Sequence, residues 1–81
     1  MGDDLISRAQ RGDTAAFQAI VEHYSEVAWR VVRVLLPGRH EAEDALQEAW
    51  LDVWRGLPGY STSRPFRPWL LAVVANRCRM M

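Results

Sequence analysis

Residues 14–36, T-A-A-F-Q-A-I-V-E-H-Y-S-E-V-A-W-R-V-V-R-V-L-L, carry apolar side chains at helical spacing and decide the fold class. The apolar positions follow helical spacing without a gap: Phe17, Ile20, Val21, Tyr24, Val27, Ala28, Val31 and Leu35. Such a stripe lets an amphipathic helix bury one face along its whole length. Asp13 or Thr14 can cap its start, and Pro37-Gly38 stops it after about Leu36.

Three shorter helices are predicted around this one. The first covers Asp3 to Arg11, the third covers Arg39 to Gly56, and the fourth runs from Pro65, near its first position, to the chain end. The third has its own buried stripe: Ala42, Ala45, Leu46, Ala49, Trp50 and Val53. Pro68, about one turn into the fourth helix, predicts an irregular start there. Strand signals are nearly absent, so we expect an all-α fold, a compact bundle of four helices forming one domain over residues 1–81.

Charge is divided unevenly along the chain. All ten acidic residues lie between Asp3 and Asp52, whereas the segment from Val53 to Met81 holds five arginines and no carboxylate. Four aromatic residues lie among those arginines: Trp54, Tyr60, Phe66 and Trp69. Arginine with exposed ring faces is typical of proteins that bind unpaired nucleic acid, and an acidic surface suits a basic protein partner. We therefore expect two working surfaces of opposite charge.

The acidic surface is predicted on the third helix. At about 100° per residue, Asp44, Gln47, Glu48 and Leu51 share one face, with Glu41 and Asp52 at its margin. Carboxylates around an apolar centre can accept arginine side chains from a partner. A solvated helix face without any partner would show the same pattern, so that alternative stays open.

The basic surface is predicted on the loop from Gly56 to Arg64 and on the helix after it. The candidate DNA-binding residues are Arg55, Tyr60, Ser61, Thr62, Ser63, Arg64, Arg67, Asn76, Arg77 and Arg79. A loop with three hydroxyls and a ring can hold one extruded base by stacking and by hydrogen bonds to its edge. Arginines can neutralise phosphate, and Asn76 can pair with a base edge. An ordinary polar turn is the alternative, and Phe66 and Trp69 are interpreted as core residues.

No motif indicates catalysis, a cofactor or a metal. There is no phosphate-binding glycine loop, and His23 and His40 are far apart without a cysteine or carboxylate pattern of the metal-binding type. The single cysteine, Cys78, excludes an internal disulfide and is interpreted as a packing residue or a partly exposed thiol. No apolar run is long enough to span a membrane, and we expect a cytoplasmic protein.

Three stretches of the chain, taken together, resemble a known family. E-A-E-D-A-L-Q-E-A-W-L-D-V-W-R-G-L (residues 41–57) and F-R-P-W-L-L-A-V-V-A-N-R-C-R (residues 66–79) resemble conserved region 2 of bacterial sigma factors. The extracytoplasmic-function (ECF) group matches best, and residues 5–24 are similar to the start of those proteins.

The resemblance implies a transcription initiation factor domain with two partners. The helix matching residues 41–57 would dock on the clamp helices of the RNA polymerase β′ subunit. The candidate polymerase-binding residues are Asp44, Gln47, Glu48, Leu51 and Asp52. The segment matching residues 57–79 would recognise and melt the promoter −10 element, capturing a flipped base of the non-template strand in the loop from about Tyr60 to Arg67. Asn76 matches a position associated with −10 recognition, and an anti-sigma factor is a candidate third partner.

The chain departs from the family pattern in two places. It lacks the region 4 helix-turn-helix, so an intact family member would continue beyond Met81. Tyr60-Ser61-Thr62-Ser63 differs from the charged, glycine-containing loop common in the group, which leaves the captured base open.

Two other functions remain for comparison. A helical protein-interaction or regulatory module would keep the acidic face and show no DNA specificity. A duplex-reading helix-turn-helix is disfavoured because the loop exceeds the usual turn of about 3–4 residues.

Overall fold

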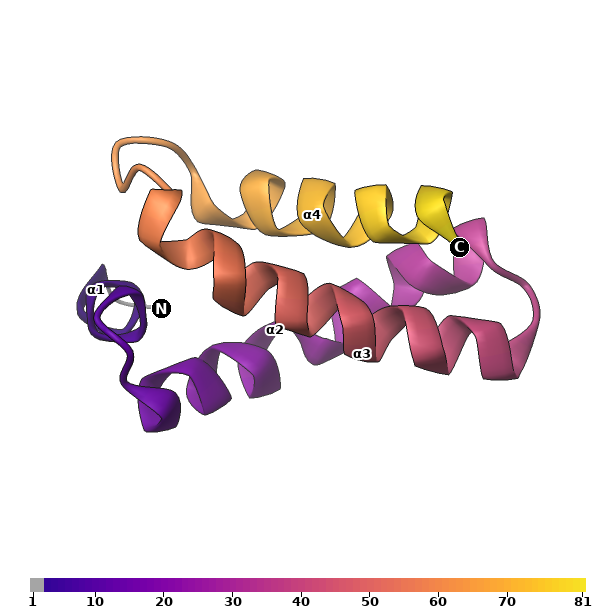
Figure 1. The fold of residues 1–81 in the computed structure, drawn as a ribbon, viewed down its shortest axis with the longest axis horizontal. Helices are drawn as coiled ribbons and strands as arrows, with labels where there is room; N and C mark the ends of the chain where they lie inside the picture. The colour runs from indigo at the N-terminus through magenta and orange to yellow at the C-terminus, as the bar shows by residue number, and fades with distance from the viewer. Residues whose placement is uncertain (1–2) are drawn as a thin grey trace.

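The computed structural model describes residues 3–81. The elements are α1 (Asp3–Gln10), α2 (Thr14–Leu35), α3 (Arg39–Gly56), the short 3₁₀ turn η1 (Leu57–Gly59) and α4 (Phe66–Met80). The described residues contain no strand, which confirms the predicted all-α bundle of four helices. In Figure 1, α2, α3 and α4 run along the length of the molecule, and α1 lies across one end, next to the start of α2. None of these helices is both long enough and apolar enough to cross a bilayer.

The junction between α1 and α2 is fixed by local chemistry. Gly12 has a φ of 95°, a left-handed conformation that ends α1 at little steric cost. Asp13 then caps α2, because one carboxylate oxygen accepts the backbone N–H of Ala16 at 3.1 Å. The other oxygen pairs with the Arg8 guanidinium at 2.9 Å. Both interactions lower the pKa of the Asp13 carboxyl, the bond from Ala16 most.

The core forms two neighbouring clusters. One lies at the α1 end: Ile6, Ala9, Ala16, Ile20, Val53, Leu57, Tyr60, Phe66 and Leu70. The other lies toward the far end of α2 and α4: Ala28, Val32, Ala42, Ala45, Ala49, Val74 and Cys78. The small side chains of α3 let α2 and α4 approach closely, and Trp50 packs against both clusters.

Two details of the predicted helices are wrong. Leu35 was assigned to the buried stripe of α2 but is 40% exposed, whereas Val32 is fully buried. α4 starts at Phe66 as regular helix, with Pro65 in an extended conformation before it. Pro68 causes no irregularity because it falls in the first turn of α4, where a backbone N–H has no intrahelical acceptor.

Candidate functional site

The loop between α3 and α4 is fastened to the core by Tyr60. The residue is only 6% exposed, and its ring packs against Phe66 and Trp69, with ring centroids 5.4 and 4.9 Å away. Its hydroxyl donates to the backbone carbonyl of Arg64, and the Arg64 N–H donates to the carbonyl of Ser61 at 3.0 Å. The residues from 61 to 64 are thus closed into a turn over the Tyr60 ring.

A hollow of about 340 Å³ lies beside this turn. Its lining comes from the loop, the start of α4 and α1: Ile6, Tyr60, Thr62, Ser63, Arg64, Pro65 and Phe66. The apolar side chains among these are buried or prolyl, while Thr62, Ser63 and Arg64 are exposed. Apolar walls with hydroxyls at the rim suit a flat, partly polar ligand such as an unstacked base. Ser61 and Ser63 are joined by their hydroxyls at 2.8 Å, which orders the rim further.

The structure changes what Tyr60 offers to a ligand. The loop was predicted to supply a ring for base stacking, but most of the Tyr60 ring is covered by neighbouring aromatics. Tyr60 is therefore placed as a wall of the hollow, and the accessible polar groups belong to the residues after it. Phe66 is buried and Trp69 half-buried, in line with their interpretation as core residues.

Next to the first hollow lies a second one of about 220 Å³, which Arg64 and Pro65 also line. Pro68, Trp69 and Ala72 complete it. The exposed Arg64 side chain therefore stands between two depressions on the same surface. A cation at that place is suited to a phosphate that links two nucleotides.

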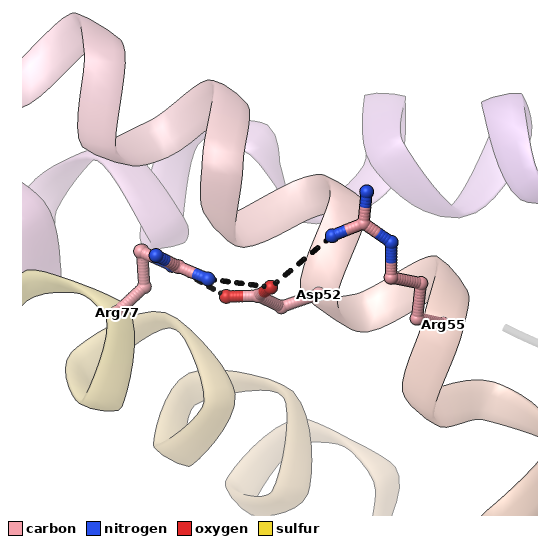
Figure 2. A network of polar contacts seen from close by, with 3 residues as sticks. All are labelled: Asp52, Arg55 and Arg77. Atoms are coloured by element: carbon pink, nitrogen blue, oxygen red, sulfur yellow. Dashed lines mark hydrogen bonds and ion pairs between the residues drawn. The ribbon is translucent and has the colours of Figure 1, made fainter.

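Arg77 is held within the protein by Asp52 (Figure 2). Its Nε and one terminal nitrogen donate to the two carboxylate oxygens at 2.7 and 2.9 Å. Arg55 lies 3.9 Å from the same carboxylate and remains largely exposed. Hydrogen bonding by Arg77 holds the pKa of Asp52 below its ordinary value, and the same bond raises the pKa of Arg77. This bidentate pair joins α3 to α4.

Asp52 and Arg77 had been predicted for opposite surfaces, one toward polymerase and one toward DNA. The structure brings them together instead, with side chains 24% and 23% exposed. Sequence reasoning missed the pair because its members lie 25 residues apart, and only the packing of α4 on α3 makes them neighbours.

The other basic side chains face solvent. Buried residues of α4 recur every four positions at Phe66, Leu70, Val74 and Cys78, which leaves Arg67, Asn76 and Arg79 exposed. Among the side chains that the structure describes, Arg64 and Arg67 form no ion pair. Arg79 donates to the Asn76 side-chain oxygen at 3.4 Å.

The acidic face of α3 is exposed as the helical spacing predicts. Asp44, Gln47 and Glu48 are exposed, and Leu51 is 45% exposed among them. They lie on the side of α3 opposite the buried Ala42, Ala45 and Ala49. Within the described side chains, neither Asp44 nor Glu48 is used in an ion pair. Both carboxylates are therefore accessible to a cationic partner.

The two histidines and the cysteine have no partner that would indicate a metal site or a reactive thiol among the described residues. Both His23 and His40 are exposed, and the described residues hold no cluster of metal-binding side chains. Cys78 is buried, and this burial raises the pKa of its thiol. The prediction missed two residues of α1, Ile6 in the wall of the hollow and Gln10 against the loop backbone. Nothing local in the sequence marks them, because their role depends on where α1 packs.

Known proteins are similar to this chain in both sequence and fold. The family described as Sigma-70 region 2 matches residues 20–81. Over 71 residues the chain is 31% identical to the ECF RNA polymerase sigma factor SigW of Bacillus subtilis, covering 88% of this chain and 38% of that protein. It is 28% identical over 75 residues to the ECF RNA polymerase sigma-E factor of Escherichia coli K12, covering 93% and 39% respectively. The chain thus spans well under half the length of these relatives.

Two solved structures resemble it closely. An engineered region 2 of sigmaE, in complex with GTAAAA, superposes with a TM-score of 0.90 at 28% identity, over 99% of this chain and 84% of the other. CnrH, in complex with the cytosolic domain of CnrY, superposes with a TM-score of 0.85 at 25% identity, over 95% and 50%.

Proposed function

Because the chain belongs to the Sigma-70 region 2 family, we propose that it is the promoter-recognising domain of an ECF transcription initiation factor. It holds unpaired DNA of the promoter −10 element with one surface and RNA polymerase with another. It acts in the cytoplasm, where both partners are found, and its role is binding rather than catalysis.

The observation that carries the DNA half of this proposal is the hollow beside the loop of residues 60–65. It belongs to a chain whose fold matches a sigmaE region 2 solved with the sequence GTAAAA. The Thr62 and Ser63 hydroxyls are exposed at its rim, where both can meet the edge of a base, the Ser63 hydroxyl while bonded to that of Ser61. Arg64 and Arg67 form no ion pair among the described side chains and can meet phosphate. Extruding a base from a duplex costs a few kcal/mol, which contacts in the hollow offset. The domain thereby favours the opened state of a promoter.

The polymerase half of the proposal rests on the acidic face of α3. Exposed carboxylates at Asp44 and Glu48 flank the exposed Leu51, an arrangement that combines charge-assisted contacts with an apolar centre. We assign this face to the β′ clamp helices. Its position on α3, away from the loop, lets the domain bind polymerase and DNA together.

A protein regulator is a further candidate partner. CnrH, which shares the fold, was solved with the cytosolic domain of another protein, CnrY. We propose that an anti-sigma factor of this kind can cover the domain. Competition between such a protein and isolated clamp helices tests this, and simultaneous binding of both without mutual effect would contradict masking of the acidic face.

The test of the proposed function has two arms. In the first, core polymerase is captured by the immobilised domain, with and without excess isolated β′ clamp helices. The competitor should abolish capture. In the second, single strands of −10-like and scrambled sequence are titrated into the domain, and the −10-like strand should bind more tightly. Capture of polymerase with equal binding of both strands would instead support a protein-interaction module without DNA specificity.

The hollow is tested by changing its rim. Thr62→Ala and Ser63→Ala remove exposed hydroxyls and should leave the fold unchanged. The double variant should lose base preference at a single −10 position, by about fivefold for one lost hydrogen bond. Preference unchanged at every position would remove the hollow from the mechanism.

A further inference from the structure

Gln10, in the last turn of α1, clamps the backbone before the DNA-binding loop. Its side-chain Nε2 donates to the carbonyl of Leu57 at 3.0 Å and to the carbonyl of Tyr60 at 2.8 Å. The Leu57 carbonyl also accepts the Tyr60 N–H at 3.0 Å. One amide group thus joins the first residue of the turn η1 to the residue that follows the turn. Because both partners are acceptors, only the NH₂ side of the amide can face them.

Ile6 lies one helical turn before Gln10, on the same side of α1. Its side chain is 6% exposed, packs in the core cluster that contains Tyr60 and Phe66, and lines the 340 Å³ hollow. α1 therefore contributes twice to the same place, with an apolar wall and with a polar clamp. Both residues precede residue 20, where the family match begins.

We propose that α1 is part of the base-binding site. Gln10 is a positioning residue: it fixes the backbone from Leu57 to Tyr60, and Tyr60 in turn carries the residues 61–64 that form the rim. Ile6 is a specificity-determining residue that sets the room available to the base. This inference rests on the proposed function and adds to it a set of residues outside the matched family region.

The physical effect of the clamp is preorganisation. Two carbonyls that keep their donor hold Tyr60 at a fixed distance from α1, so the hollow exists before a base arrives. Without the donor, the turn relaxes and part of the binding free energy is spent on ordering it again. The loss falls mainly on the base that fits best, because a loosened site discriminates less.

Two substitutions of Gln10 test the clamp. Gln10→Met keeps the length of the side chain and removes the donor, and Gln10→Glu places carboxylate oxygens against the two carbonyls. Gln18→Met is the matched control, since Gln18 is exposed on α2 and its side chain donates only a long, exposed hydrogen bond of 3.4 Å to Glu22. The measurement is the ratio of affinities for single strands that differ in one base. A fraction of unfolded protein lowers every affinity by the same factor, so this ratio responds to the site and not to stability.

We expect both Gln10 variants to lower the ratio about fivefold, the factor that corresponds to one hydrogen bond, with clamp-helix affinity and the Gln18→Met ratio unchanged.

Ile6→Val, a mild change that opens the wall by one methylene, should shift the purine-to-pyrimidine affinity ratio by at least about twofold. Wild-type ratios in the Gln10 variants would overturn the positioning role, and a wild-type ratio in Ile6→Val would overturn the wall. After either of these negative results, the proposed function would still stand if the wild-type protein prefers −10-like strands.

A wild-type protein without any base preference would overturn the proposed function and this inference together.

Discussion

The salt dependence of single-strand binding should reveal how many arginines meet DNA. Five arginines follow Asp52 in the sequence, but they are not equivalent in the structure. Arg77 donates two hydrogen bonds to the Asp52 carboxylate, and the Arg55 guanidinium lies 3.9 Å from the same carboxylate. Three others, Arg64, Arg67 and Arg79, have no carboxylate partner among the described side chains. We therefore expect three phosphate contacts rather than five.

This difference has a measurable size. For single strands, the logarithm of affinity falls with the logarithm of salt by about 0.7 per phosphate contact, which gives a slope of about −2 for three contacts and about −3.5 for five. Between about 50 and 200 mM salt, three contacts predict an affinity loss of about 18-fold, and five predict about 130-fold. The difference between these two affinity losses is far larger than the error of a titration.

The assay is fluorescence anisotropy with a labelled single strand that contains GTAAAA, titrated at several NaCl concentrations. Arg67→Ala should make the slope shallower by about 0.7. Arg77→Ala should leave the slope unchanged and lower the thermal stability, because it breaks the link between α3 and α4. Arg30→Ala, on the exposed side of α2, is the control that changes neither. A wild-type slope near −3.5, or an Arg77→Ala slope as shallow as that of Arg67→Ala, would refute the assignment of Arg77 to the fold.

Three further predictions concern other parts of the domain. Asp44→Arg should weaken clamp-helix binding by at least about tenfold and leave single-strand binding intact or stronger, with Glu22→Arg as a control on α2; loss of both activities in a folded variant would argue against separate surfaces. The pKa of Asp52 lies below its ordinary value of 3.8, so the ion pair with Arg77 stabilises the fold fully above pH 3.8, and this stabilisation is lost as the pH falls through the lowered pKa. The difference in melting temperature between wild type and Asp52→Asn should therefore disappear at low pH. A difference that stays constant would contradict this. Burial raises the pKa of the Cys78 thiol, so iodoacetamide should label the native protein far more slowly than the denatured protein, as mass spectrometry can follow, and equal rates would show an accessible thiol.

The helices could be predicted because residues at or next to each helix end signal where the helix starts and stops. Asp13 caps α2, Pro37-Gly38 follows its end, and α3 covers Arg39–Gly56 as expected. The apolar spacing within each helix also gave most of the buried face. The miss at Leu35 arises because periodicity alone does not say which of two adjacent turns a neighbouring helix covers.

The site was less accessible to sequence reasoning. Exposure of Asp44 and Glu48 follows from helical geometry, and the sequence was sufficient for it. The pairing of Asp52 with Arg77 and the two bonds from Gln10 to the loop join residues 25 to 50 positions apart. They depend on how helices pack, which no local pattern encodes. Burial of Tyr60 has the same origin, since its covering rings come from α4.

Separate surfaces for polymerase and DNA can be observed directly by NMR. The ¹⁵N-labelled domain is titrated in turn with the isolated β′ clamp helices and with a GTAAAA single strand, and backbone amide shifts are compared. We expect the clamp helices to move the signals of Asp44, Gln47 and Glu48, and the single strand to move those of Thr62, Ser63 and Arg64. A single shared set of moved signals, or single-strand shifts confined to α3, would contradict the account.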